Sequence, residues 1–133
     1  MMTLTSVGRI AYALPFGVFG IIHLISAGAM AAVVPDWIPG SVLWVILSGL
    51  ALLAACVAIA SQRYVWQAAL GLAALLGLFI VTVHLPGLFD PPRMRLALTS
   101  LLKDTALAGA ALIIAGVSAP TRRSRTTQIG AQS

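Results

Sequence analysis

Four long apolar runs are the feature of this sequence that most restricts its fold. They cover residues 10–34, 42–60, 65–85 and 96–119. Each holds about 19–25 residues, enough for a helix to cross a hydrocarbon core of roughly 30 Å. Lipid offers no partner for backbone N–H and C=O groups, so a spanning segment of this kind must be helical. The sequence therefore predicts an all-α integral membrane protein, a bundle of four transmembrane helices.

The remaining residues form short connections between these runs. Apolar residues make up 60% of the 133-residue chain and charged residues 8%, so no soluble domain of ordinary size fits beside the four spans. Residues typical of turns separate the runs at 34–41, 61–64 and 86–92. We expect an up-down-up-down bundle over residues 1–120. Its helices are expected at about 8–34, 41–61, 65–85 and 91–119, with a flexible basic tail over 121–133.

The arginines predict an orientation. The ends expected on one side of the bilayer carry five of them: Arg9, Arg63, Arg122, Arg123 and Arg125. The other side carries Arg93 and Arg95. The positive-inside rule then places both termini in the cytoplasm. A cleaved signal peptide is the competing reading of the first run, but that run is longer than a signal usually has.

The net charge of +5 suits contact with a membrane surface. Basic residues are not interleaved with aromatic ones, as a nucleic-acid surface would need, so we expect a lipid bilayer and no nucleic acid as partner.

Four ionisable residues lie inside the apolar runs: His23, His84, Lys103 and Asp104. A lysine or an aspartate deep in hydrocarbon costs roughly 2.5–3.5 kcal/mol, so the protein must compensate it. At 1.5 Å per residue, all four are expected in the outer half of the bilayer. This convergence from three helices predicts a ligand-binding or proton-handling site, with Arg93, Asp36 and Trp37 as secondary candidates from the outer loops.

A structural role is the alternative for each of these residues. Lys103 would extend to the outer surface while Asp104 stays buried, and the two side chains should diverge by about 100°. His23 would be a neutral core imidazole, and His84 an interfacial residue at a helix end. For Lys103, the acids Asp36 and Asp90 of the outer loops are available as partners.

Cofactor chemistry receives little support from the residues. A haem held by both histidines would need them at similar depth, and the estimate separates them by roughly 10 Å. Cys56 is the only cysteine, so no dithiol mechanism is available within the chain. No metal-ligand cluster or nucleophile–base motif occurs. Gly109 and Gly116 are expected to mark close contact between helices.

The chain resembles the DoxX-like family of small four-helix membrane proteins. The resemblance rests on Arg9, on Gly20 and His23, on the stretch 34–39 (Val-Pro-Asp-Trp-Ile-Pro) and on residues 102–112 around Lys103 and Asp104. It implies an accessory subunit in a bacterial plasma membrane, near quinone or thiol redox chemistry. It implies no defined reaction.

Three functions are compatible with these residues. The first is an accessory or scaffold subunit of a membrane redox or stress-response complex, which binds a protein partner or a second copy of itself and needs no cofactor. The second is a quinone-binding subunit of an oxidoreductase, in which His23, Lys103 or Asp104 contacts the head group. The third is a small-solute permease, although inverted repeats are not evident. The sequence does not predict an enzyme that works alone.

Overall fold

The computed structural model describes residues 3–121 and confirms an all-helical fold within them. Four helical segments are long and apolar enough to cross a membrane. They are α1 (Leu4–Ile25), α3 (Ser41–Ser61), the continuous segment Val65–Gly87, and α6 (Met94–Ser118). The third segment consists of α4 (Val65–Phe79), one π-helical turn η2 (Ile80–His84) and α5 (Leu85–Gly87). The expected tail was placed at 121–133, and its residues 122–133 lie outside the part of the chain that the structure describes.

The first apolar run does not form one helix, so the expectation of a helix over 8–34 is wrong at both ends. α1 begins at Leu4, where the Thr3 side chain accepts a hydrogen bond from the Ser6 backbone N–H. It ends at Ile25, because Ser26 leaves helical geometry (φ −106°, ψ 22°). Two short pieces follow, α2 (Ala27–Met30) and the 3₁₀ turn η1 (Ala31–Val33). Serine and glycine near this break are weak helix formers.

The last helix also starts later than expected, at Met94 instead of residue 91. Two consecutive prolines, Pro91 and Pro92, explain the delay, because the residue before a proline is disfavoured in helical geometry. The α3–α4 connection is tight, with Gln62 and Tyr64 both in the left-handed region (φ 61° and 56°). This turn sets α4 antiparallel to α3.

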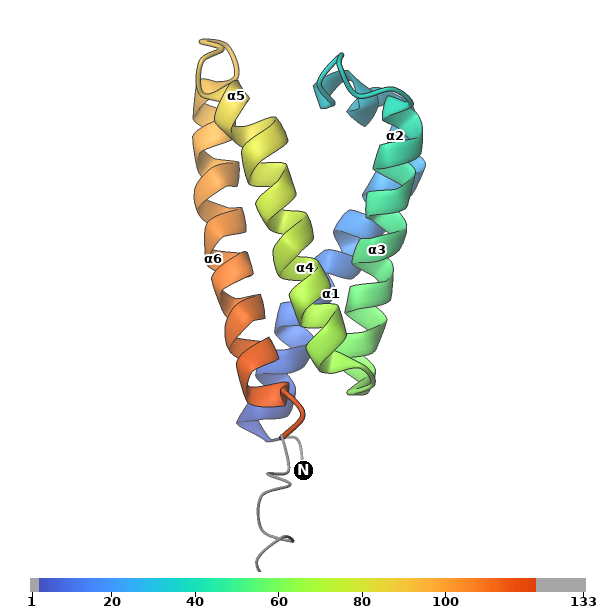
Figure 1. Ribbon diagram of the computed structural model, residues 1–133, viewed down its shortest axis with the longest axis vertical. Coiled ribbons are helices and arrows are strands. Elements are labelled where there is room, and N and C mark those ends of the chain that lie inside the picture. The colour runs from blue at the N-terminus through green and yellow to red at the C-terminus, as the bar shows by residue number, and fades with distance from the viewer. Residues whose placement is uncertain (1–2, 122–133) are drawn as a thin grey trace, which may run out of the picture.

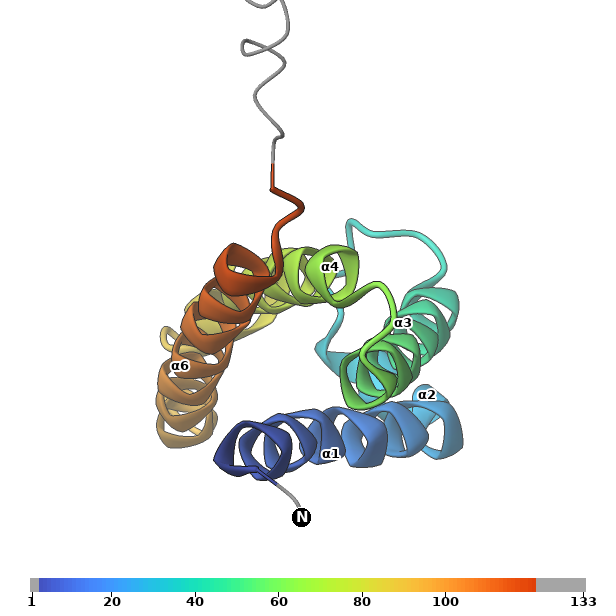
Figure 2. The same cartoon turned by 90° about the horizontal axis from the view of Figure 1, so that it is seen from below.

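The bundle consists of two helix pairs, α1 with α3 and α4 with α6. A shared core joins them, with Phe16, Ile59 and Leu72 as its largest fully buried side chains. The Tyr12 hydroxyl on α1 also donates a 2.7 Å hydrogen bond to the Leu107 carbonyl on α6. Beyond this core the pairs diverge toward the end that holds α2 and α5 (Figure 1). Seen along its length, the bundle has the four helices arranged around a centre (Figure 2).

Large apolar side chains are exposed on every long helix, for example Leu14, Leu47, Leu78 and Ile113. A soluble monomer rarely exposes apolar surface of this extent. These outward faces are therefore the faces that contact lipid. The chain is an integral membrane protein.

Candidate functional site

Asp104 occupies one position in a seam of small buried residues on α6. The buried residues of this helix are Ala97, Asp104, Ala111 and Ala115. Spacings of seven and four residues place them on one helix face, which packs against the third segment. Gly109 and Gly116 are exposed instead, and a Cβ added at either would have no neighbour within 4 Å among the described residues. The expectation that these two glycines mark helix contact is therefore wrong for contacts within the described chain.

His84 is the direct partner of Asp104. Its Nε2 lies 2.8 Å from Asp104 Oδ2, and the two side chains are only 16% and 5% exposed. This contact joins the third segment to α6. His84 therefore points into the bundle, toward α6.

The π-helical turn aims His84 at this partner. The buried residues of α4 are Ala69, Leu72 and Leu76, and a regular helix would continue their face to Val83, seven residues after Leu76. The backbone N–H of Leu85 bonds to the carbonyl of Ile80, a five-residue step. The extra residue shifts the inward position by one, from Val83 to His84. Such turns are rare and occur often at functional sites.

Lys103 completes a three-residue cluster with His84 and Asp104. Its Nζ lies 3.4 Å from Asp104 Oδ1 and 4.6 Å from the centre of the Phe19 ring on α1. The flexible side chain bends back to its neighbour, so the expected divergence of the two side chains does not separate their charged ends. Lys103 remains 45% exposed. It contacts Asp104 and an aromatic face, and neither Asp36 nor Asp90 is its ion-pair partner in the described residues.

His23 lies beside this cluster without a polar contact to it among the described residues. Its Nδ1 lies 2.7 Å from the Phe19 carbonyl of its own helix, and a carbonyl only accepts, so Nδ1–H must donate. The imidazole also stacks on Phe79, with ring centres 6.0 Å apart. The ring contact of His23 is thus with Phe79, and that of Lys103 is with Phe19. The four candidates share one region of the fold, but only three form a continuous polar cluster.

The arrangement can hold a charge and a proton in an apolar setting. The Asp104 carboxylate accepts from Nε2–H of His84 and contacts the Lys103 ammonium, which compensates its burial. With its proton fixed on Nε2, a neutral His84 carries its lone pair on Nδ1, where it can act as a base. Within residues 3–121, no three His, Cys, Asp or Glu side chains gather as a metal site would require.

The secondary candidates Asp36, Trp37 and Arg93 line one pocket of about 430 Å³ between the diverging pairs. One wall comes from residues 32–37, and the other includes Val81, Thr82 and Val83, directly before His84. Arg93 also faces Asp90, with 3.8 Å between its Nε and Oδ2. The charged cluster does not itself line this outer pocket; the pocket adjoins the turn that carries His84.

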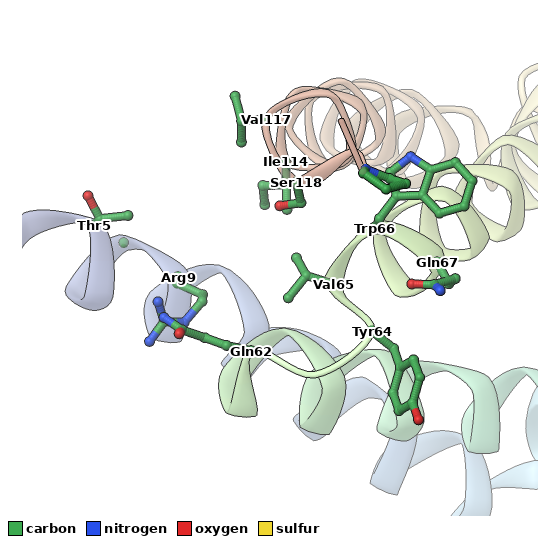
Figure 3. A pocket seen from close by; sticks show the side chains of 12 residues that line it. Thr5, Arg9, Gln62, Tyr64, Val65, Trp66, Gln67, Ile114, Val117 and Ser118 are labelled. Carbon is green, nitrogen blue, oxygen red and sulfur yellow. The ribbon is translucent and has the colours of Figure 1, made fainter. Parts of the chain in front are cut away.

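A second pocket, of about 810 Å³, lies at the opposite end of the bundle (Figure 3). α1, the α3–α4 turn and the end of α6 form its walls, and Arg9 is the only charged residue among the described residues that line it. From the sequence, Arg9 served the orientation and the DoxX-like resemblance, and Gln62, whose side-chain amide lies against Arg9, had no predicted role. The available signal was an arginine at the edge of an apolar helix with no acid nearby in the sequence.

The comparisons with known proteins identify a family but no activity. A family model described as "Domain of unknown function (DUF8561)" matches residues 12–93, more than half of the chain. The chain belongs to this family. The matched region contains His23 and His84 and ends before Lys103 and Asp104. No curated protein and no solved structure matches the chain.

Proposed function

We propose that this member of the DUF8561 family is an accessory subunit of a membrane redox complex, whose cluster of His84, Asp104 and Lys103 binds a quinone head group and handles its proton. The observation that carries the proposal is the buried His84–Asp104 contact of 2.8 Å in a membrane-spanning bundle. Ionisable groups inside membranes are expensive, and by default they indicate a site for a ligand, an ion or a proton.

Each of the three side chains has a different chemical role in this proposal. Lys103 is nearly half exposed and already neutralises Asp104, so its ammonium can donate a further hydrogen bond to a quinone carbonyl. His84 can take up or release a proton at Nδ1 while Asp104 holds the other ring nitrogen. The Phe19 ring beneath Lys103 and the Phe79 ring on which His23 stacks add apolar surface around the cluster.

The surroundings suit the rest of such a ligand. The outer pocket borders the turn that carries His84 and has apolar walls from Val33, Val81 and Val83. An isoprenoid tail would lie along the exposed apolar faces of the helices, in contact with lipid. Reduction of a quinone to a quinol takes two electrons and two protons. We assign proton handling to this chain and the electron donor to a partner subunit. The DoxX-like resemblance supports this redox setting, with both termini in the cytoplasm of a bacterial cell.

Quinone content tests the proposal. The protein is purified in mild detergent, extracted with organic solvent and assayed for quinone per polypeptide, and then titrated with a short-tailed benzoquinone. We expect bound quinone in the native protein. We expect on the order of ten-fold weaker binding for Lys103→Leu, since a hydrogen bond to a charged group contributes about 1.5–3 kcal/mol. His84→Gln should weaken binding in the same direction.

Arg95→Leu is the matched control, because Arg95 is an exposed cation on the same helix outside the cluster. It should bind quinone like the native protein. A preparation free of quinone that does not bind the benzoquinone, yet copurifies with a specific protein, would contradict the ligand site and leave a scaffold. A Soret band in the visible spectrum would contradict it in favour of haem.

A further inference from the structure

We propose that the pocket at the other end of the bundle is a second site, which binds the phosphate of an anionic phospholipid with Arg9 as its anchoring cation. This inference is independent of the quinone proposal, because the two sites share no residue. This pocket, of about 810 Å³, is formed by the start of α1, the α3–α4 turn and the end of α6 (Figure 3). These elements all end at the same face of the bundle, where a lipid head group lies.

Arg9 carries a charge that has no counter-charge among the described residues that line this pocket. Its Nε is fully buried and has no hydrogen-bond partner within residues 3–121. Its terminal nitrogens lie against the side-chain amide of Gln62, a neutral group whose oxygen can accept from them when the amide is turned toward Arg9. The lining residues include no aspartate or glutamate. A partly buried guanidinium gains most from an oxyanion, and its planar donors match a phosphate.

Further polar groups surround the same space. Thr5 lines the pocket one turn before Arg9 on α1, and Ser118 lines it from the end of α6 (Figure 3). Gln67 lines the pocket from the first turn of α4. Their hydroxyl and amide groups can donate to the remaining phosphate oxygens or to the polar part of a head group. The volume of about 810 Å³ accommodates such a group with room for an acyl chain.

The apolar lining favours a lipid over a free phosphate ion. Val65, Ile114 and Val117 line the pocket together with Trp66 and Tyr64. Tryptophan and tyrosine are typical of the membrane–water interface, and basic pockets between helices at the cytoplasmic face are typical sites for anionic lipid head groups. A free phosphate would leave this apolar surface unused. The expected cytoplasmic orientation of this face, where anionic lipids gather, agrees with the assignment.

The test compares lipids on the purified protein by native mass spectrometry. We expect phosphatidylglycerol to remain bound through detergent removal at a level at least five-fold above phosphatidylcholine of the same chain length. Arg9→Gln should abolish that preference. Arg63→Gln is the matched control, because Arg63 is exposed in the same turn and does not line the pocket; it should keep the preference.

A second variant guards against an Arg9 substitution that fails to fold. Gly8 lines the pocket, and a Cβ added there meets nothing within 4 Å among the described residues. A Gly8→Leu side chain therefore starts in open space and should occupy the pocket and expel the lipid. Gly71→Leu, at an equally open position on α4, should leave lipid binding unchanged. Equal binding of the two lipids, or an unchanged preference in Arg9→Gln and Gly8→Leu, would overturn the proposal. So would displacement of phosphatidylglycerol by millimolar inorganic phosphate, which would identify a soluble anion as the ligand.

Discussion

The two helix pairs of this bundle achieve close contact in different ways. α1 and α3 meet backbone to backbone, because a Cβ added at Gly20 would lie 2.8 Å from the Gly49 carbonyl and 2.7 Å from Leu53 Cγ. The third segment and α6 instead pack an alanine seam that is interrupted by Asp104 and closed by His84. The first contact is steric and needs only small residues. The second contains a charge that costs free energy unless its partner is present.

The difference separates a pair held by packing alone from a pair whose seam also contains a buried ionisable contact. Burying an aspartate at a seam position costs free energy. An alanine would avoid this cost, and it would fit there as it does at residues 97, 111 and 115. The glycine-based contact gives α1 and α3 a fixed geometry without any ionisable group. The substitutions below test this contrast, each through unfolding in detergent.

His84→Ala should have the largest effect on stability. It leaves the Asp104 carboxylate buried beside only the half-exposed Lys103, and loss of one partner of a buried pair typically costs about 3–5 kcal/mol. Chemical unfolding monitored by circular dichroism measures this loss. His23→Ala is the control, because its polar bond is to its own helix and its loss should be about 1 kcal/mol. Equal losses for the two variants would contradict the contrast.

Gly20→Ala should be next, with a loss of about 1–3 kcal/mol from overpacking. The new methyl group would collide with the backbone of α3, which cannot move aside like a side chain. Gly109→Ala, at an open position on α6, should instead be neutral or stabilising by up to about 1 kcal/mol. Thermal unfolding of both variants makes the comparison. A tolerated Gly20→Ala would show that α1 and α3 are not in backbone contact.

Tyr12→Phe should cost about 0.5–1.5 kcal/mol, the usual net contribution of one hydrogen bond. The Tyr12 hydroxyl links the two helix pairs through the Leu107 carbonyl, so this substitution weakens the connection between them and neither pair itself. The unfolding free energy of this variant should therefore fall by the same amount in the native and Gly20→Ala backgrounds, as expected for independent sites. A much larger loss in one background would indicate that the two contacts are coupled.

Lys103→Leu should have the smallest effect on stability, about 1 kcal/mol or less. The lysine is 45% exposed, and exposed ion pairs contribute little. His84 would still hold the Asp104 carboxylate. The proposed quinone binding, in contrast, should decrease strongly in this variant. A loss of stability as large as that of His84→Ala would show that Lys103 is the principal partner of Asp104.

The sequence predicted the four spans, because hydropathy depends only on position along an apolar run. From residue depth it also predicted that His23, His84, Lys103 and Asp104 meet; the structure joins the last three, while His23 bonds to its own helix. The residues that form the contact face of each helix were harder to predict from the sequence. Glycine was expected to mark contact on α6, but the contact face is the alanine seam with Asp104 in it. An i, i+7, i+14 pattern of Ala97, Asp104 and Ala111 was available as a signal.

Three features could not be read from the sequence. The π-helical turn changes the residue count per turn locally, so a constant helical period cannot place His84 correctly. The break at Ser26 depends on how the chain packs, because a serine in a long apolar run does not by itself end a helix. Arg9 and Gln62 meet only after the α3–α4 turn folds back toward α1. Their contact joins residues more than fifty positions apart, and no local pattern indicates it.

A double-mutant cycle of His84→Ala and Asp104→Ala tests the central pairing most directly. Since alanine fits the seam on α6, the double variant should recover at least half of the stability lost in His84→Ala, with a coupling free energy of about 2 kcal/mol or more. If the losses of unfolding free energy in the two single variants simply add in the double variant, the His84 and Asp104 side chains do not interact. That result would contradict the buried pair.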